Sequence, residues 1–304
     1  MSGVQHVLAA GPIAVRRPSR PSWHPHLHGS ELAWAIAFVA PYAAVFFAFA
    51  VYPIAYGFWM GSAPSLYAEL VSDPLYVRAA ITTLLYVGIG VNVKMFLALL
   101  LSGFFMRRRW WIKALMVIYL LPWALPAIPA SVSFHWMLIG PQGLLDSLLS
   151  AVLGIDGPIW FTDRWLALGA DIVSYIWRWL PFWTLIFLAG RMAIPRDLYE
   201  AADIDGATGL RRFVHVTFPL LANLYLVSTL LSTIWMIGDF TTVSIVSGGA
   251  PALSTHVLAT LSIRYAFDAA RPELGVATAM SALPVLIPIV IVLMRRVQAR
   301  EVQL

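Results

Sequence analysis

The sequence predicts an all-α integral membrane protein with six transmembrane helices and one polar cytoplasmic loop. Of its 304 residues, 60% are hydrophobic and only 12% are charged, whereas about a quarter of the residues in soluble domains are charged. Six apolar stretches reach the roughly 20 residues that a helix needs to cross a bilayer. The basic residues gather beside alternate ends of these stretches. These observations exclude a soluble globular protein and indicate that membrane lipid surrounds the chain.

The chain divides into a membrane domain and two tails. Residues 1–30 are rich in Pro, His, Arg and Ser and lack the apolar core of a signal peptide, so we expect a disordered cytoplasmic tail. Residues 31–297 form one transmembrane domain, and residues 298–304 form a second cytoplasmic tail. Within the domain, spans are expected at about 32–60, 79–105, 114–138, 166–190, 217–246 and 274–294.

The third span differs from the others because it contains Pro122, Pro126 and Pro129. Proline removes a backbone donor, and a membrane helix tolerates this only where neighbouring groups compensate. We therefore expect this span to be kinked or partly unwound and to lie against protein rather than lipid. After it, glycines and prolines in the outer loop at 139–165 predict turns, with a short helix at about 143–153.

The orientation follows from the arginines and lysines. Fourteen of them lie in the first tail, between spans two and three, between spans four and five, and after span six, whereas four lie on the opposite side. Cytoplasmic segments carry such an excess of basic residues. Both termini and the loop between spans four and five are therefore predicted to be cytoplasmic, and topology rather than nucleic-acid binding explains the net charge of +5.

Several kinds of chemistry have no candidate residues. The chain has no cysteine and only two lysines, Lys94 and Lys113. Neither lysine follows the glycine loop that cradles nucleotide phosphates, and the serine-nucleophile and zinc-protease motifs are also missing. We therefore expect no enzyme, no metal site and no cofactor in this chain. Any ATP and Mg²⁺ would be bound by another polypeptide.

The loop between spans four and five contains the most informative motif. It includes Glu200-Ala201-Ala202, then Asp205-Gly206, and later Pro219. Pro195 favours the first turn of a helix, and Gly206 suits a helix end because glycine takes positive φ without strain. A second short helix, capped by Thr208, would end at Pro219. Leu198, Ala201, Ala202 and Ile204 would give the first helix a small-residue apolar face.

This spacing resembles the EAA loop of the permease subunits of type I ATP-binding-cassette (ABC) importers. In that family the loop inserts into a groove on a separate ATPase subunit. The resemblance implies that the ATPase contact is made by Glu200, Ala201, Ala202, Asp205, Gly206 and Pro219. It also implies the partners: a second permease, two copies of the ATPase, and a periplasmic or lipid-anchored solute-binding protein. We call residues 195–219 the coupling loop.

The resemblance covers about residues 32–296 and favours the carbohydrate-uptake branch of that family. It includes Tyr52-Pro53, Leu121-Pro122-Trp123, Leu180-Pro181-Phe182 and the run Ser247-Gly248-Gly249-Ala250-Pro251. Ala250 replaces a usual glycine, and Thr82-Thr83 stands where Asn-Thr is common. The implied function is sugar uptake across the bacterial inner membrane, with ATP hydrolysed on the partner.

Candidate residues for the solute path come from polar and aromatic side chains within spans. Ionisable groups there cost a few kcal/mol and are functional candidates, while tryptophan faces suit the C–H surfaces of sugars. The candidates are Lys94, Trp136, Arg178, Asn223, Trp235 and Asp239. A structural role for Arg178, and snorkelling or subunit pairing for Lys94, remain alternatives.

Three other functions remain open at the level of sequence. An ABC importer for polyamines or phosphate esters would have the same loop, and Lys94 keeps an anionic solute possible. An ion-coupled secondary transporter would use Lys94, Arg178 and Asp239 as a charge relay, but it would not need the coupling loop. An assembly or signalling subunit would dock an ATPase without transporting a solute.

Overall fold

The computed structural model describes residues 29–107 and 109–301, and their regular secondary structure is helical. The predicted first tail therefore lies almost wholly outside the described residues. The chain divides into two units, residues 1–54 and 55–304. In the first unit, α1 (Gly29–Phe46) contains Pro41 and passes through the π-helical turn η1 (Phe47–Val51) into α2 (Tyr52–Met60). Residues 33–60 are long and apolar enough to span a membrane.

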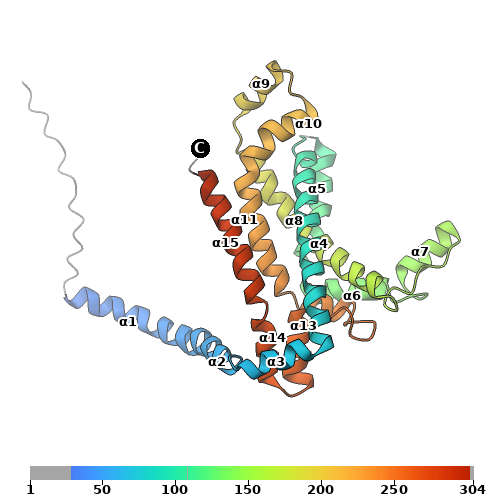
Figure 1. The fold of residues 1–304 in the computed structure, drawn as a ribbon. Coiled ribbons are helices and arrows are strands. Elements are labelled where there is room, and N and C mark those ends of the chain that lie inside the picture. The colour runs from blue at the N-terminus through green and yellow to red at the C-terminus, as the bar shows by residue number, and fades with distance from the viewer. Residues whose placement is uncertain (1–28, 108, 302–304) are drawn as a thin grey trace, which may run out of the picture. The chain divides into compact units, whose positions relative to one another are not determined.

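The second unit is built around three long helices, α4 (Pro74–Phe105), α8 (Arg164–Met192) and α11 (Phe218–Ile237). In Figure 1, α4 and α11 run beside one another, and α8 packs against both. Their shared core contains buried aromatic and aliphatic side chains, among them Tyr86, Met95, Tyr175, Phe187 and Met236. Hydrocarbon-facing residues cover the outside, so each helix is apolar around most of its circumference.

The predicted third span is sharply broken. It consists of α5 (Trp110–Ala124) and α6 (Ala127–Met137), which are bent by 98° at the break. Leu125 is extended there because it precedes Pro126. The expected kink is therefore a nearly right-angled bend. Within the described chain, α5 packs against α8 by one face, while Leu115, Val117 and Ile118 are exposed, so the expectation that other protein lies against this span stays a prediction.

The last two spans also differ from their predicted bounds. The fifth was expected at 217–246, but α11 ends at Ile237, and α12 (Thr241–Val246) follows after a break at Gly238–Phe240. The sixth consists of α14 (Pro272–Met280) and α15 (Leu283–Glu301), with a turn between them. Among the described residues, five helices can span a membrane, or six if the bent pair α5 and α6 counts as one.

Short helices occupy the end of this unit that carries the loops predicted to be outside. They are α3 (Pro64–Ser72), α7 (Leu144–Leu153), α13 (Leu258–Ile263) and the π-helical turn η3 (Arg264–Asp268). The helix predicted at 143–153 thus corresponds to α7. A second buried cluster, including Leu70, Leu261 and Leu274, joins α3, α13 and α14.

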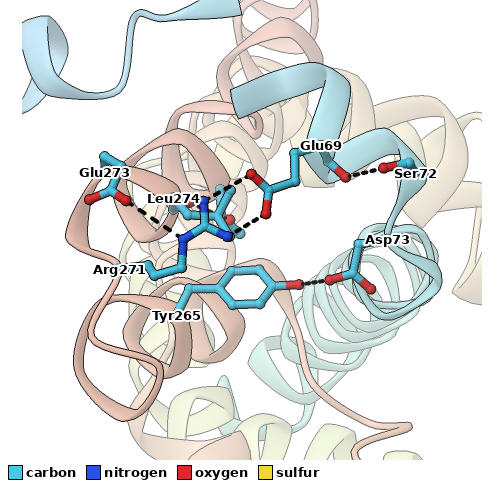
Figure 2. A network of polar contacts seen from close by, with 8 residues as sticks. Glu69, Ser72, Asp73, Tyr265, Arg271, Glu273 and Leu274 are labelled. Atoms are coloured by element: carbon cyan, nitrogen blue, oxygen red, sulfur yellow. Dashed lines mark hydrogen bonds and ion pairs between the residues drawn. The ribbon is translucent and has the colours of Figure 1, made fainter. Parts of the chain in front are cut away.

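A polar network lies over this second cluster (Figure 2). Arg271 donates to both carboxylate oxygens of Glu69 and also contacts Glu273 at 3.6 Å. Tyr265 donates to Asp73, whose other carboxylate oxygen accepts from the amide of Leu75 at 2.7 Å and so caps α4. We call these five side chains, Glu69, Asp73, Tyr265, Arg271 and Glu273, the outer clasp, because they connect α3 and the start of α4 to η3 and α14.

Candidate functional site

The coupling loop folds as a helical knuckle at the other end of the unit (Figure 1). It contains α9 (Arg196–Ile204), α10 (Gly209–Arg212) and the π-helical turn η2 (Phe213–Thr217). Gly206 lies between the two short helices with φ +69°, as its predicted role at a helix end requires. Asp205 is exposed beside it, after the end of α9.

Two details of the predicted loop geometry are wrong. Thr208 precedes α10, but its side chain makes no capping hydrogen bond. Pro219 does not end a helix, because the chain continues helically from Gly209 through η2 into α11, where Pro219 lies in the first turn. The wider π-helical turn just before Pro219 gives the chain a place to accommodate the missing N–H.

The expected small-residue face is divided between the two sides of α9. Ala202 is buried, whereas Glu200, Ala201 and Leu198 are exposed. The exposed side also includes Ile204, which is 87% exposed. A charged residue and uncovered apolar residues therefore lie together on the outer surface of the knuckle, as is typical of a docking surface.

Interactions within the loop brace the knuckle. Arg212 donates to both carboxylate oxygens of Asp203, at 2.8 and 3.1 Å. Its guanidinium lies over the ring of Tyr199 at 5.6 Å, and the Tyr199 hydroxyl is 3.3 Å from that of Thr217. Because these contacts join α9 to α10 and η2, the loop can move as one body.

A polar cluster lies within the membrane domain, between α4, α8 and the end of α11. The Tyr86 hydroxyl donates to Asp239 at 2.8 Å. The ammonium of Lys94 lies over the ring of Tyr175 at 4.4 Å and has no hydrogen-bond partner among the described residues. Lys94 and Asp171 are both fully buried, and the Asp171 carboxylate lies beside Ser247.

An aromatic cluster adjoins these charges. The ring of Trp235 lies 5.3 Å from that of Trp179, 5.6 Å from that of Trp183 and 5.8 Å from that of Phe182. The guanidinium of Arg178 lies over Trp179 at 5.2 Å. Trp235 is 37% exposed, so the cluster presents part of its aromatic surface. We call Arg178, Trp179, Phe182, Trp235 and Asp239 the aromatic face.

The structure brings together four of the six side chains predicted for the solute path. Arg178, Trp235 and Asp239 belong to the aromatic face, and Lys94 lies behind it, in electrostatic range of Asp239. Trp136 lies on α6 and is 61% exposed. Asn223 is twelve residues before Trp235 on α11, which is about 18 Å along a helix.

Sequence reasoning did not propose Tyr86, Asp171, Trp179 or Phe182 for the solute path. Asp171 could have been found, because it is an ionisable residue within a predicted span. Tyr175, Trp179 and Trp183 are spaced by four, which places them on one side of a helix. That spacing was available, but it does not distinguish an exposed aromatic surface from a packed one.

Comparisons with known proteins agree with this architecture. Residues 94–303 match the family described as binding-protein-dependent transport system inner membrane component. The chain is 31% identical to the sulfoquinovosyl glycerol transport system permease of Agrobacterium fabrum over 81% of this chain and 84% of that one. It is 37% identical to the trehalose/maltose transport system permease of Thermococcus litoralis over 50% and 51% of the two chains.

A solved structure has the same fold. A chain of a bacterial ABC transporter involved in the import of the acidic polysaccharide alginate superposes with a TM-score of 0.74 and 21% identity, covering 88% of this chain and 96% of that one. Its helices therefore follow the same course even where the sequences differ. Together with the family match over most of the membrane domain, this establishes that the chain belongs to the binding-protein-dependent transport system inner membrane components, the permease subunits of ABC importers.

Proposed function

We propose that this permease forms, with a second permease subunit, the path for a sugar or sugar-like solute. The aromatic face is the observation that carries the proposal. Aromatic rings provide flat apolar surfaces for the C–H groups of a sugar ring, and a carboxylate such as that of Asp239 accepts hydrogen bonds from hydroxyls. The relatives named for sulfoquinovosyl glycerol and for trehalose or maltose support the same solute class.

Charged side chains of both signs lie around the aromatic face, which does not suit a polyamine, a solute with several positive charges. Two cations, Lys94 and Arg178, lie near two carboxylates, Asp171 and Asp239. Lys94 is fully buried behind Tyr175, so its ammonium does not line the exposed part of the aromatic face.

The coupling loop would dock a separate ATPase subunit that binds ATP and Mg²⁺. Glu200 supplies charge, and Ile204 and Leu210, which are 87% and 76% exposed, supply apolar surface. Covering apolar surface of this kind removes it from water and so favours association with a partner. Two ATPase copies, one for each permease, would open and close and so alternate the access of the path.

The remaining proposals concern orientation and delivery. The excess of basic residues on one side supports a cytoplasmic location for both termini and the coupling loop. The helices at the opposite end, including α3, α7 and α13, would then face the periplasm. A binding protein would deliver the solute there, from the periplasm or from a lipid anchor.

A copurification experiment tests the coupling loop. The tagged chain is isolated from its native membranes beside a variant that carries both Glu200→Arg and Gly206→Pro. We expect an ATPase with a phosphate-binding glycine loop to be recovered with the wild type only. If neither form recovers an ATPase while the chain alone still moves solute in vesicles, the ion-coupled secondary transporter replaces this proposal.

A second experiment tests the solute class. The complete complex in vesicles is supplied with its binding protein and with maltose, trehalose, sulfoquinovosyl glycerol, spermidine or glycerol phosphate. We expect at least one of the sugars to stimulate ATP hydrolysis and to accumulate, and spermidine and glycerol phosphate to do neither. Stimulation by spermidine or glycerol phosphate alone would refute the sugar assignment, and an ATPase that no solute stimulates would favour an assembly or signalling role.

A further inference from the structure

Arg191 joins three elements near the coupling loop. It lies in the last turn of α8, and its guanidinium points at the neighbouring end of α4. There Nε donates to the Ser102 hydroxyl at 2.7 Å, and Nη2 donates to the Leu99 carbonyl at 2.9 Å. The same guanidinium lies over the ring of Phe213 in η2 at 5.3 Å.

The acceptors on α4 are shielded from solvent, which strengthens the contact. Ser102 is fully buried, and Leu99 is 3% exposed. Hydrogen bonds from a charged donor in such surroundings contribute more than neutral ones. The planar guanidinium reaches both acceptors at once, which the single ammonium of a lysine cannot reproduce.

The coupling loop has chain connections to α8 and α11 but not to α4. On one side, residues 193–195 link α8 to α9, and on the other, η2 runs directly into α11. Between the loop and the end of α4 lies a cavity of about 280 Å³, lined by Gly103 and Met106 on one side and by Tyr199 and Phe213 on the other. Arg191 also lines this cavity and bridges it.

We propose that Arg191 is the positioning residue that transmits movement of the coupling loop to α4. The proposal rests on the proposed function, because it requires an ATPase to move the loop. If the coupling loop moves as one body, it would move α11 because η2 continues directly into that helix. It would move α8 through the short linker at residues 193–195. α4, which carries Tyr86 and Lys94, already packs along α8 through their shared core, and the two hydrogen bonds of Arg191 would make its loop end follow the same movement.

A distance measurement tests the bridge without any solute. Because the chain has no cysteine, a pair of spin labels can be placed at Leu100→Cys on α4 and Val214→Cys in η2, both exposed. The complete complex is measured without nucleotide and with ATP and Mg²⁺ under conditions that block hydrolysis. We expect one narrow distance in both states for the wild type, and a broad distribution that shifts on ATP binding for Arg191→Met.

Transport stoichiometry provides the readout that a merely structural role would not change. This measurement uses the sugar that the uptake experiment identifies. We expect the Arg191→Met complex to retain its ATPase and to hydrolyse ATP. The number of solute molecules moved per ATP should fall about tenfold, which is within the usual range of coupling free energies. Arg191→Lys and Ser102→Ala, which each retain part of the contact, should give intermediate losses. Arg295→Met, which removes an exposed arginine at the end of another span, is the matched control.

The possible results separate this proposal from the one on which it rests. If the wild type recovers no ATPase, the proposed function fails. If the ATPase is recovered and Arg191→Met keeps both the narrow distance and the wild-type solute moved per ATP, only the role of Arg191 is refuted. Loss of ATPase binding in Arg191→Met would also refute it, since Arg191 would then serve assembly. If Arg191→Met does not fold, Arg191→Lys and Ser102→Ala decide between the outcomes.

Discussion

Among single residues, Tyr86 has the clearest expected effect. Its hydroxyl donates to the Asp239 carboxylate at 2.8 Å and so fixes the orientation of an acceptor on the aromatic face. A hydrogen bond to a charged group is worth about 1.5–3 kcal/mol. We therefore expect Tyr86→Phe to raise the half-saturating sugar concentration for uptake about tenfold, with little change in maximal rate. The measurement is uptake into vesicles that contain the complete complex.

Two further variants distinguish an effect of Tyr86 on the position of Asp239 from a general loss of helix packing. In an Asp239→Asn background, Tyr86→Phe should add less than about a twofold change, because coupled residues are not additive. Tyr119→Phe removes a comparable interhelical hydroxyl contact, with Thr184 at 2.8 Å, and should leave the half-saturating concentration unaltered. Equal effects of Tyr86→Phe in both backgrounds would contradict a role through Asp239.

Single residues also show what could be predicted from the sequence and what could not be predicted. Gly206 was predicted at a helix end, and its φ of +69° confirms the need for glycine. The outward and inward directions of Ala201 and Ala202 depend on how α9 packs against the rest of the loop. Likewise, the Tyr86 contact joins residues 153 positions apart, and no local pattern encodes such a pairing.

At the scale of elements, α14 and η3 approach too closely for any side chain at position 275. A Cβ on Gly275 would lie 2.6 Å from the Cβ of Ala266 and 2.6 Å from the backbone oxygen of Ser262. Overpacking of this kind costs about 1–3 kcal/mol. We expect Gly275→Ala to lower the melting temperature of the purified chain by several degrees, measured by intrinsic fluorescence in detergent.

Gly88 provides the matched control on another long helix. No atom lies within 4 Å of a Cβ placed there, and alanine is about 1 kcal/mol better than glycine in a helix. Gly88→Ala should therefore keep or raise the melting temperature. A Gly275→Ala chain as stable as the wild type would mean that η3 and α14 are less closely packed than the structure indicates.

The outer clasp makes the contact between α3 and α14 dependent on pH. The hydrogen bond from Arg271 lowers the pKa of Glu69 below its ordinary value of 4.5. The clasp should therefore stabilise the fold fully above about pH 4.5 and lose this contribution as the pH falls through the lowered pKa. The melting temperature of Glu69→Gln should lie below that of the wild type at pH 7, and the two should converge as the pH falls through the lowered pKa of Glu69.

Glu273→Gln tests whether the effect belongs to the paired carboxylate. Glu273 contacts the same arginine at 3.6 Å, whereas Glu69 accepts from two guanidinium nitrogens. Because exposed ion pairs contribute little unless their geometry is bidentate, Glu273→Gln should lower the melting temperature less than Glu69→Gln at pH 7. A pH-independent difference for Glu69→Gln would exclude an electrostatic role of the clasp.

The elements were predictable where hydropathy alone defines them. α4 covers the predicted second span and begins five residues before it, and α8 extends beyond the predicted fourth span by two residues at each end. The 98° bend after Ala124 was not predictable in magnitude, because prolines fix local angles but packing decides how far the two halves diverge. α11 ends before the predicted bound because Gly238 ends the helix. In the sequence this glycine lies inside a long apolar stretch, so hydropathy alone does not show the end of the helix.

For the whole molecule, the number of spans and the family could be predicted from the sequence. The sequence could not show which surfaces face lipid and which face a partner subunit. α5 presents Trp110 at 82% exposure and Val117 at 65%. Lipid, a second permease or both can cover such a surface, and each would be equally apolar. The coupling loop is different, because the polar residues around Ile204 and Leu210 are typical of a surface in contact with water rather than with lipid.

The orientation of the whole molecule yields a prediction that needs neither solute nor ATPase. The absence of cysteine allows single variants such as Leu210→Cys in the coupling loop and Phe267→Cys in η3, which are both 76% exposed. A membrane-impermeant maleimide added to cells with a permeabilised outer membrane should label position 267 and not position 210. Lysis should then make position 210 reactive, because the basic residues beside it hold the loop in the cytoplasm. The reverse labelling order would place the coupling loop outside and would rule out any contact with a cytoplasmic ATPase.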